Sequence, residues 1–206
     1  ELREMDKQLN GEGFSGFDPF GPGLVRTWAN LVGAYGGRLF TEEGDLGFND
    51  GTGAKALDFL AGLVNDGTAD PSSVPGTGEP RLIAQGRAAM APMGTATWDE
   101  LNGAGLGDEA HMAFFPMPPG DAGGEPSILR TGTVLSVSRQ SRYQDVAFQF
   151  VHYCLEDQPL STTAAMIPAI PSRTGLLVTS ELSSNRIANA GLASIDHAGV
   201  MLGGSD

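Results

Sequence analysis

Apolar residues recur at helical spacing along much of this chain, and they predict a series of helices. These cover residues 2–9, 24–35, 53–65, 80–86, 97–103, 142–156 and 183–198, with one more short helix after Asp157. The pattern expects an inner face on 53–65 made of Ala56, Leu57, Leu60, Leu63 and Val64. On 142–156 it expects an inner face made of Val146, Ala147, Phe150, Val151 and Cys154.

Short apolar runs between these helices predict strands at 14–17, at 87–93, at 131–138 and in the segment that begins at His111. A small hairpin is expected around Gly44. Helices and strands alternate from end to end, which is typical of the α/β class. The first predicted helix has no N-cap before it, so we expect the chain to be a piece of a longer protein.

The charge narrows the possible partners. Twelve basic against 25 acidic side chains give a net charge of −13, which leaves no basic surface for nucleic acid or for an anionic membrane. A single cysteine excludes an internal disulfide and a cysteine-based zinc cluster. The apolar runs are far shorter than the roughly 20 residues that cross a bilayer.

The motifs favour binding over catalysis. The glycine spacing of "GEGFSG", residues 11–16, follows a predicted helix and enters a strand, the reverse of a dinucleotide-binding loop. The adjacent carboxylates Asp99 and Glu100 suit the first turn of a helix, where acids are favourable. Loops of Gly, Pro, Thr and aromatic residues instead suit a carbohydrate, which stacks on rings and hydrogen-bonds through hydroxyls. We expect no cofactor and no metal.

The order of several stretches resembles the extracellular solute-binding proteins of ABC importers, in the family-1, sugar-binding branch that includes maltose-binding protein. The resembling stretches are "ELREMDKQL", "TWANLVGAYGGRLF", "FNDGTGAKALDFLAGLVNDG", "LIAQGRAAMAPMGTATW", "FFPMPPGDAGG", "TGTVLSVSRQSRYQDVAFQFVHYCL" and "IPAIPSR". Each is weak alone, but seven in the right order over nearly the whole chain are specific.

The resemblance implies a type II periplasmic-binding-protein fold, with two lobes and about twice this length. Residues 1–108 and 160–206 would then form the second lobe. Residues 109–159 would be a strand and helix excursion into the first lobe, whose remainder, like the C-terminal helices, is absent from this chain.

The resemblance also places a ligand site between the lobes. Trp98, with Thr97, matches the tryptophan of the family's Gly-x-Trp platform, although the gap from Gly94 is longer here. Gly23 to Arg26 match a ligand-contacting loop whose aromatic and acidic residues are replaced, so Phe17, Asp18 and Phe20 could substitute. Thr131 and Gly132 match a Gly-Gly pair at the cleft. Two alternatives remain open: Trp98 could cover the core, and Thr131 and Gly132 could be a strand entry.

The implied function is non-enzymatic capture of a sugar and its delivery to the transmembrane subunits of an ABC permease. The protein would be extracytoplasmic and held at the membrane through an N-terminal lipid anchor outside this chain. Two alternatives stay open. One is a glycan-active enzyme that uses Asp99 or Glu100, and the other is a protein-interaction module on the same fold.

Overall fold

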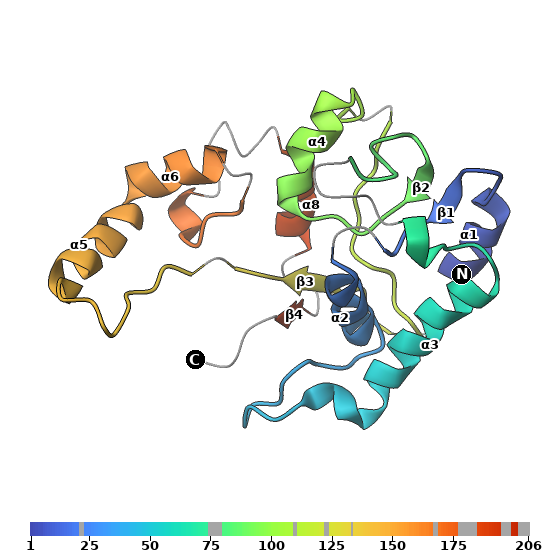
Figure 1. The fold of residues 1–206 in the computed structure, drawn as a ribbon, viewed down its shortest axis with the longest axis horizontal. Coiled ribbons are helices and arrows are strands. Elements are labelled where there is room, and N and C mark those ends of the chain that lie inside the picture. The colour runs from blue at the N-terminus through green and yellow to red at the C-terminus, as the bar shows by residue number, and fades with distance from the viewer. Residues whose placement is uncertain are drawn as a thin grey trace.

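The computed structural model describes residues 1–20, 23–73, 80–108, 111–121, 124–132, 134–166, 169–176, 185–194 and 199–201 (Figure 1). Its helices are α1 (Leu2–Leu9), α2 (Leu24–Ala34), α3 (Thr52–Asn65), α4 (Trp98–Gly103), α5 (Gln144–Cys154), α6 (Asp157–Met166) and α8 (Arg186–Ala193). Its strands are β1 (Ser15–Phe17), β2 (Ala88–Met90), β3 (Ile128–Arg130) and β4 (Gly199–Met201). Apart from 80–86, each predicted helix has a counterpart near the expected place; of the one predicted at 183–198, residues 183–184 and 195–198 lie outside the described ranges.

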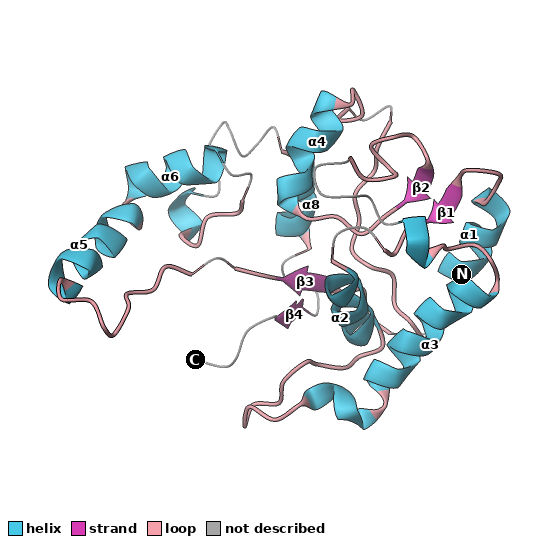
Figure 2. Ribbon diagram, in the orientation of Figure 1, coloured by secondary structure: helices cyan, strands magenta, loops and turns pink. Residues whose placement is uncertain are grey.

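The strands are short and form two separate parallel pairs, β1 with β2 and β3 with β4 (Figure 2). The strand predicted at 87–93 shrinks to β2, and the helix predicted at 80–86 is a series of turns. The prediction of a strand at 131–138 is wrong, because the residues that pair with another strand lie just before it, in β3. The segment after His111 contributes one bridge, from Met117 to Ser127, and the expected hairpin one bridge, from Phe40 to Leu46.

Two helices and the first strand pair organise the core. On α2 the buried side chains include Leu31 and Val32, which pack against Ala56 and Leu60 of α3. Leu63, one turn further along α3, faces Phe17 of β1 instead. Trp28 joins the first cluster as expected for a core residue: its ring meets Phe48 edge-on, and its indole N–H donates to the Gly53 carbonyl at 3.1 Å.

The buried stripe of α3 is narrower than its apolar pattern. Ala56, Leu60 and Leu63 are buried, but Leu57 is 58% exposed and Val64 is 37% exposed, so both were wrongly placed on the inner face. Positions one residue further along the helix are rotated by 100°, beyond the sector that α2 and β1 cover. Neighbouring elements therefore select which apolar residues of α3 are buried.

Helix α5 is the largest departure from the sequence expectation. None of its residues is buried, and Val146 and Phe150 are 62% and 63% exposed instead of facing inward. Figure 1 shows the reason: an extended segment leaves β3 and carries α5 and α6 away from the remainder of the molecule. Helix α6 packs against α5. The domain division predicted at residue 159 falls inside α6 and stays a prediction.

An ion pair network ties α1 to the end of α3. The Asp66 carboxylate accepts from Arg3 Nε at 2.5 Å and lies 3.1 Å from Lys7 Nζ. Hydrogen bonds from Arg3 and then Lys7 lower the pKa of Asp66 to about 2.

Replacing Asp66 with Asn should therefore change the acid stability profile. A carboxyl whose folded pKa is depressed contributes stability above its unfolded pKa, near 3.9, and that contribution disappears as pH falls through the folded value. The difference in melting temperature between wild type and D66N should be constant above about pH 5. It should shrink toward zero as the pH falls from about 4 to 2. Thermal unfolding followed by circular dichroism measures it, and a gap that persists at pH 2 would contradict this role.

Candidate functional site

The parallel pairing of β1 and β2 brings two distant loops to one edge of the molecule. Ser15 is in register with Ala88, and Phe17 with Met90, so both strands end at the same edge. The segment from Asp18 to Arg26 leaves one strand, and the segment that leads to Trp98 leaves the other. The Asp18 N–H donates to the Met90 carbonyl at 2.9 Å and joins the two exits. Ligands of open α/β sheets bind at such carboxyl ends of strands.

Asp18 and Phe20 form the inner layer of this edge. Asp18 is 4% exposed and Phe20 is 8% exposed, and the Phe20 N–H donates to Asp18 Oδ1 at 3.1 Å. The Phe20 ring packs with Phe17, Leu63 and Ala69. In this structure the two residues hold the first loop in place, and their side chains are not presented at the surface.

Thr97 is also buried, at 2% exposure, and is held by an arginine that the sequence did not single out. Arg81 Nη1 donates to Thr97 Oγ1 at 2.7 Å and to Glu100 Oε2 at 3.0 Å. The Arg81 backbone N–H donates to the other oxygen of Glu100 at 2.5 Å. Arg81 and Glu100 thus fasten the first turn of α4 to the turn that precedes β2.

Trp98 begins α4 and is half-buried. Its ring packs against the cluster of Leu82, Ile83 and Leu101, and the Phe114 ring crosses it at 6.4 Å with an interplanar angle of 65°. Trp98 therefore does cover the core, as one interpretation of the sequence held, and it keeps part of its surface exposed. Its predicted role as a ligand platform stays a prediction.

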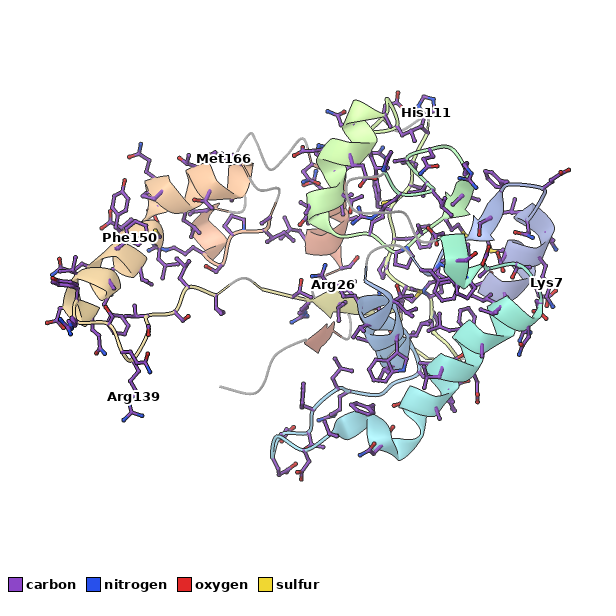
Figure 3. All side chains as sticks on the ribbon, in the orientation of Figure 1. Lys7, Arg26, His111, Arg139, Phe150 and Met166 are labelled. Atoms are coloured by element: carbon purple, nitrogen blue, oxygen red, sulfur yellow. The ribbon has the colours of Figure 1, made fainter. Side chains whose placement is uncertain are left out.

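The exposed part of the candidate site comes from the start of α2 and the end of β3. Gly23 and Arg26 are exposed, as are Thr131 and Gly132, and α2 packs against β3. Figure 3 shows Arg26 at the start of α2, beside β3. A Cβ placed on Gly132 would meet no atom within 4 Å, so the surface there is open. The strand-entry interpretation of Thr131 and Gly132 is wrong, because β3 ends before them.

The adjacent carboxylates do not form an acid and base pair. Glu100 is engaged by Arg81 through both oxygens, whereas Asp99 points to solvent. Within the described ranges, no group of three His, Cys, Asp or Glu side chains could hold a metal ion. The described helices also include none that is both long and apolar enough to cross a bilayer.

Removing the Arg81 side chain should loosen Trp98. R81M leaves Thr97 Oγ1 and a Glu100 oxygen without their charged donor, so we expect a loss of about 1–3 kcal/mol in unfolding free energy. Near-ultraviolet circular dichroism of Trp98 should weaken in parallel. R38M is the matched control, because Arg38 and Glu42 form a pair whose side chains are 64% and 89% exposed. Such pairs contribute roughly 0–1 kcal/mol, and an equal effect of both variants would contradict the role of Arg81.

Sequence reasoning missed Arg81 and a second residue, Asp6, which lies fully buried on α1. Asp6 is four residues after Leu2, and both face β1, whereas Met5 and Leu9, the other apolar residues at helical spacing from Leu2, are 42% and 45% exposed. An acidic residue one turn from an apolar one was the available signal. Arg81 had no comparable signal, because its contacts join residues up to 19 positions apart.

Comparison with known proteins identifies the family of this chain and two structures with a similar fold. Residues 1–159 match the family described as bacterial extracellular solute-binding protein. No curated protein matches the chain. The fold is similar to the GacH receptor of Streptomyces glaucescens GLA.O, studied without ligand and with acarbose, with a TM-score of 0.70 and 21% identity. It is also similar to an ABC transporter solute-binding protein from Thermotoga lettingae TMO bound with α-D-tagatose, with a TM-score of 0.68 and 16% identity.

Both similarities extend over nearly all of this chain but only part of the other proteins. They cover 92% and 94% of this chain, and 49% and 51% of the two solved chains. The chain thus spans about half the length of these structures, and at such identities the likeness concerns the fold. The family assignment rests on the sequence match, which includes β1, β2 and α5. The chain belongs to the bacterial extracellular solute-binding protein family.

Proposed function

We propose that this protein is the substrate-binding component of an ABC importer and that it acts outside the cytoplasm. It captures a carbohydrate or related polar solute and delivers it to a membrane permease. The observation that carries the proposal is the meeting of the β1 and β2 exits at one edge. Family membership and the two similar solved structures, one in complex with acarbose and one bound with α-D-tagatose, support a sugar as the solute.

In this proposal each loop has a distinct task. The exposed part of the Trp98 ring receives the apolar C–H face of a sugar. No side chain among the described residues caps the first turn of α2. The Arg26 and Thr27 N–H groups donate to the Gly23 carbonyl. The N–H groups of Leu24 and Val25 are therefore the ones proposed to meet hydroxyl oxygens. Arg26 and Thr131 add side-chain donors from the neighbouring surface. The predicted lobe boundaries, 1–108 with 160–206 against 109–159, belong to the same proposal, with the solute held between the lobes.

Isothermal titration calorimetry of the whole chain tests the solute class. The panel should contain mono-, di- and oligosaccharides and polyols, with amino acids and dipeptides as a second class. We expect heat only from members of the first class. Binding of amino acids or dipeptides only would overturn the carbohydrate assignment. The absence of binding by every compound would overturn it as well.

Tryptophan fluorescence locates the site. The chain has two tryptophans, so W28F leaves Trp98 as the single reporter. A binding sugar should shift the emission of W28F. W98L retains apolar volume against Leu101 but removes the ring, and its affinity should fall roughly 2–10-fold, as expected for an aromatic contact of about 0.5–1.5 kcal/mol. An unchanged affinity in W98L would move the site away from Trp98.

A protein-interaction module is the second candidate, and the exposure of α5 favours it. Val146, Phe150 and Tyr153 lie at helical spacing and are each more than half exposed. Such a surface is typical of a contact with another protein. The same titrations separate the two functions, because a module without a solute site would leave the W28F emission unchanged by every compound of the panel.

A further inference from the structure

Asp6 is a carboxylate enclosed within the protein. It is 0% exposed and is the only residue of α1 that is buried. The basic side chains of the same helix, Arg3 and Lys7, are occupied by Asp66. Removing a carboxylate from water is costly unless hydrogen bonds replace the lost hydration. The burial of the Asp6 carboxylate therefore requires a physical explanation.

The Asp6 side chain is used on one oxygen only. Its Oδ1 accepts the buried N–H of Phe17 at 2.7 Å. Its Oδ2 is buried and has no hydrogen-bond partner among the described residues. A carboxylate that is satisfied on one side contributes little net stability, since the second oxygen bears the full desolvation cost. The contact is thus better suited to fixing a geometry than to stabilising the fold.

The geometry in question is the exit of β1. A Cβ on Gly16 would lie 2.2 Å from the Asp6 carbonyl oxygen, so α1 and β1 approach as closely as a glycine allows. Phe17, whose N–H Asp6 holds, is the last residue of β1. The next two N–H groups are then fixed in turn, Asp18 by Met90 and Phe20 by Asp18, with Pro19 lacking an N–H between them.

We propose that Asp6 is a positioning residue for solute binding, which orients residues Asp18 to Phe20 through its hydrogen bond to Phe17. The proposal rests on the proposed function. Asp6 does not reach the solute. It acts through a relay of hydrogen bonds that ends at Phe20, three residues before the exposed Gly23 at the start of α2.

Three variants of the whole chain test this role. D6A removes the acceptor, D6N keeps an oxygen at the Oδ1 position, and E4A removes an exposed acid from the same helix as the matched control. Hydrogen exchange of the backbone amides, measured without ligand, reports the relay directly. Calorimetry with the sugar that binds best to wild type reports the site, at a temperature where each variant is folded by circular dichroism.

We expect D6A to speed amide exchange at Phe17, Asp18 and Phe20 at least tenfold while α8 keeps its wild-type rates. The affinity of D6A should fall at least tenfold, with D6N intermediate and E4A within twofold of wild type. If D6A does not fold, D6N is the deciding variant. In D6N, amide exchange at Phe17 must be faster and sugar affinity must be lower than in wild type.

Two results would overturn the role of Asp6. One is wild-type exchange at Phe17 in D6A, or in D6N if D6A is unfolded. The other is faster local exchange with unchanged affinity. A wild-type chain that binds no sugar refutes the proposed function instead, and the exchange data then still show whether Asp6 holds the exit of β1.

Discussion

G16A is expected to lower the unfolding free energy by at least about 3 kcal/mol, near or above the upper end for overpacked sites. The added Cβ would stand 2.2 Å from the Asp6 carbonyl oxygen and 2.7 Å from Asp6 Oδ1. The first of these atoms belongs to the α1 backbone, so no side-chain rotation relieves the clash, and α1 must separate from β1. For a chain of this size the melting temperature should fall roughly 6–12 °C.

G11A is the matched control for this substitution. Gly11 lies just before β1, and a Cβ there would meet no atom within 4 Å. Its backbone does not use the left-handed region, so alanine fits without strain. Urea unfolding of both variants measures the contrast. Equal stability of G16A and wild type would show that α1 does not rest on β1 as closely as described, and would remove the basis for the role of Asp6.

L63A is expected to cost about 2–5 kcal/mol, the range for deleting a fully buried leucine side chain. Leu63 is 0% exposed and packs beneath Phe17 and Phe20, the residues that carry the first loop of the candidate site. The cavity would therefore open under that loop. Urea unfolding measures the loss, and sugar affinity should weaken as the loop loses its support.

L57A is the matched control on the same helix. Leu57 is 58% exposed, so the same deletion there should change the unfolding free energy by less than about 0.5 kcal/mol. The apolar pattern of α3 placed both leucines on the inner face. Similar losses in L57A and L63A would contradict the narrow buried stripe of α3.

Local signals predicted much of the candidate site's framework. The helix at α2 was predicted from its apolar spacing, and Gly36, just beyond it, adopts a left-handed φ of 78°. A short apolar run predicted a strand at 14–17, where β1 lies, and a helix was predicted at 97–103, where α4 lies. Family resemblance, carried by motif order, was confirmed by the match over residues 1–159.

The supporting contacts of the site could not be predicted from local signals. Asp6 and Phe17 are 11 positions apart, and Arg81 and Thr97 are 16 apart, beyond the span of one helix or turn. Phe20 and Asp18 were named as possible substitutes for the family's aromatic and acidic ligand contacts, and both are buried in this structure, so that role stays a prediction. A residue type indicates which contacts are possible, and the packing of distant segments decides which are made.

The sequence by itself determined roughly where most helices lie, because apolar spacing and glycines act over a few residues, although the helix predicted at 80–86 is a series of turns. The tertiary structure alone decided which face of each helix is buried, since that depends on neighbours: Asp6 and not Met5 on α1, and Leu63 and not Leu57 on α3. It also decided that the ladder forms at β3 and not at 131–138, because a strand needs a partner in register. For the same reason α5 keeps an apolar pattern without a buried face, since among the described elements little beyond α6 lies against it.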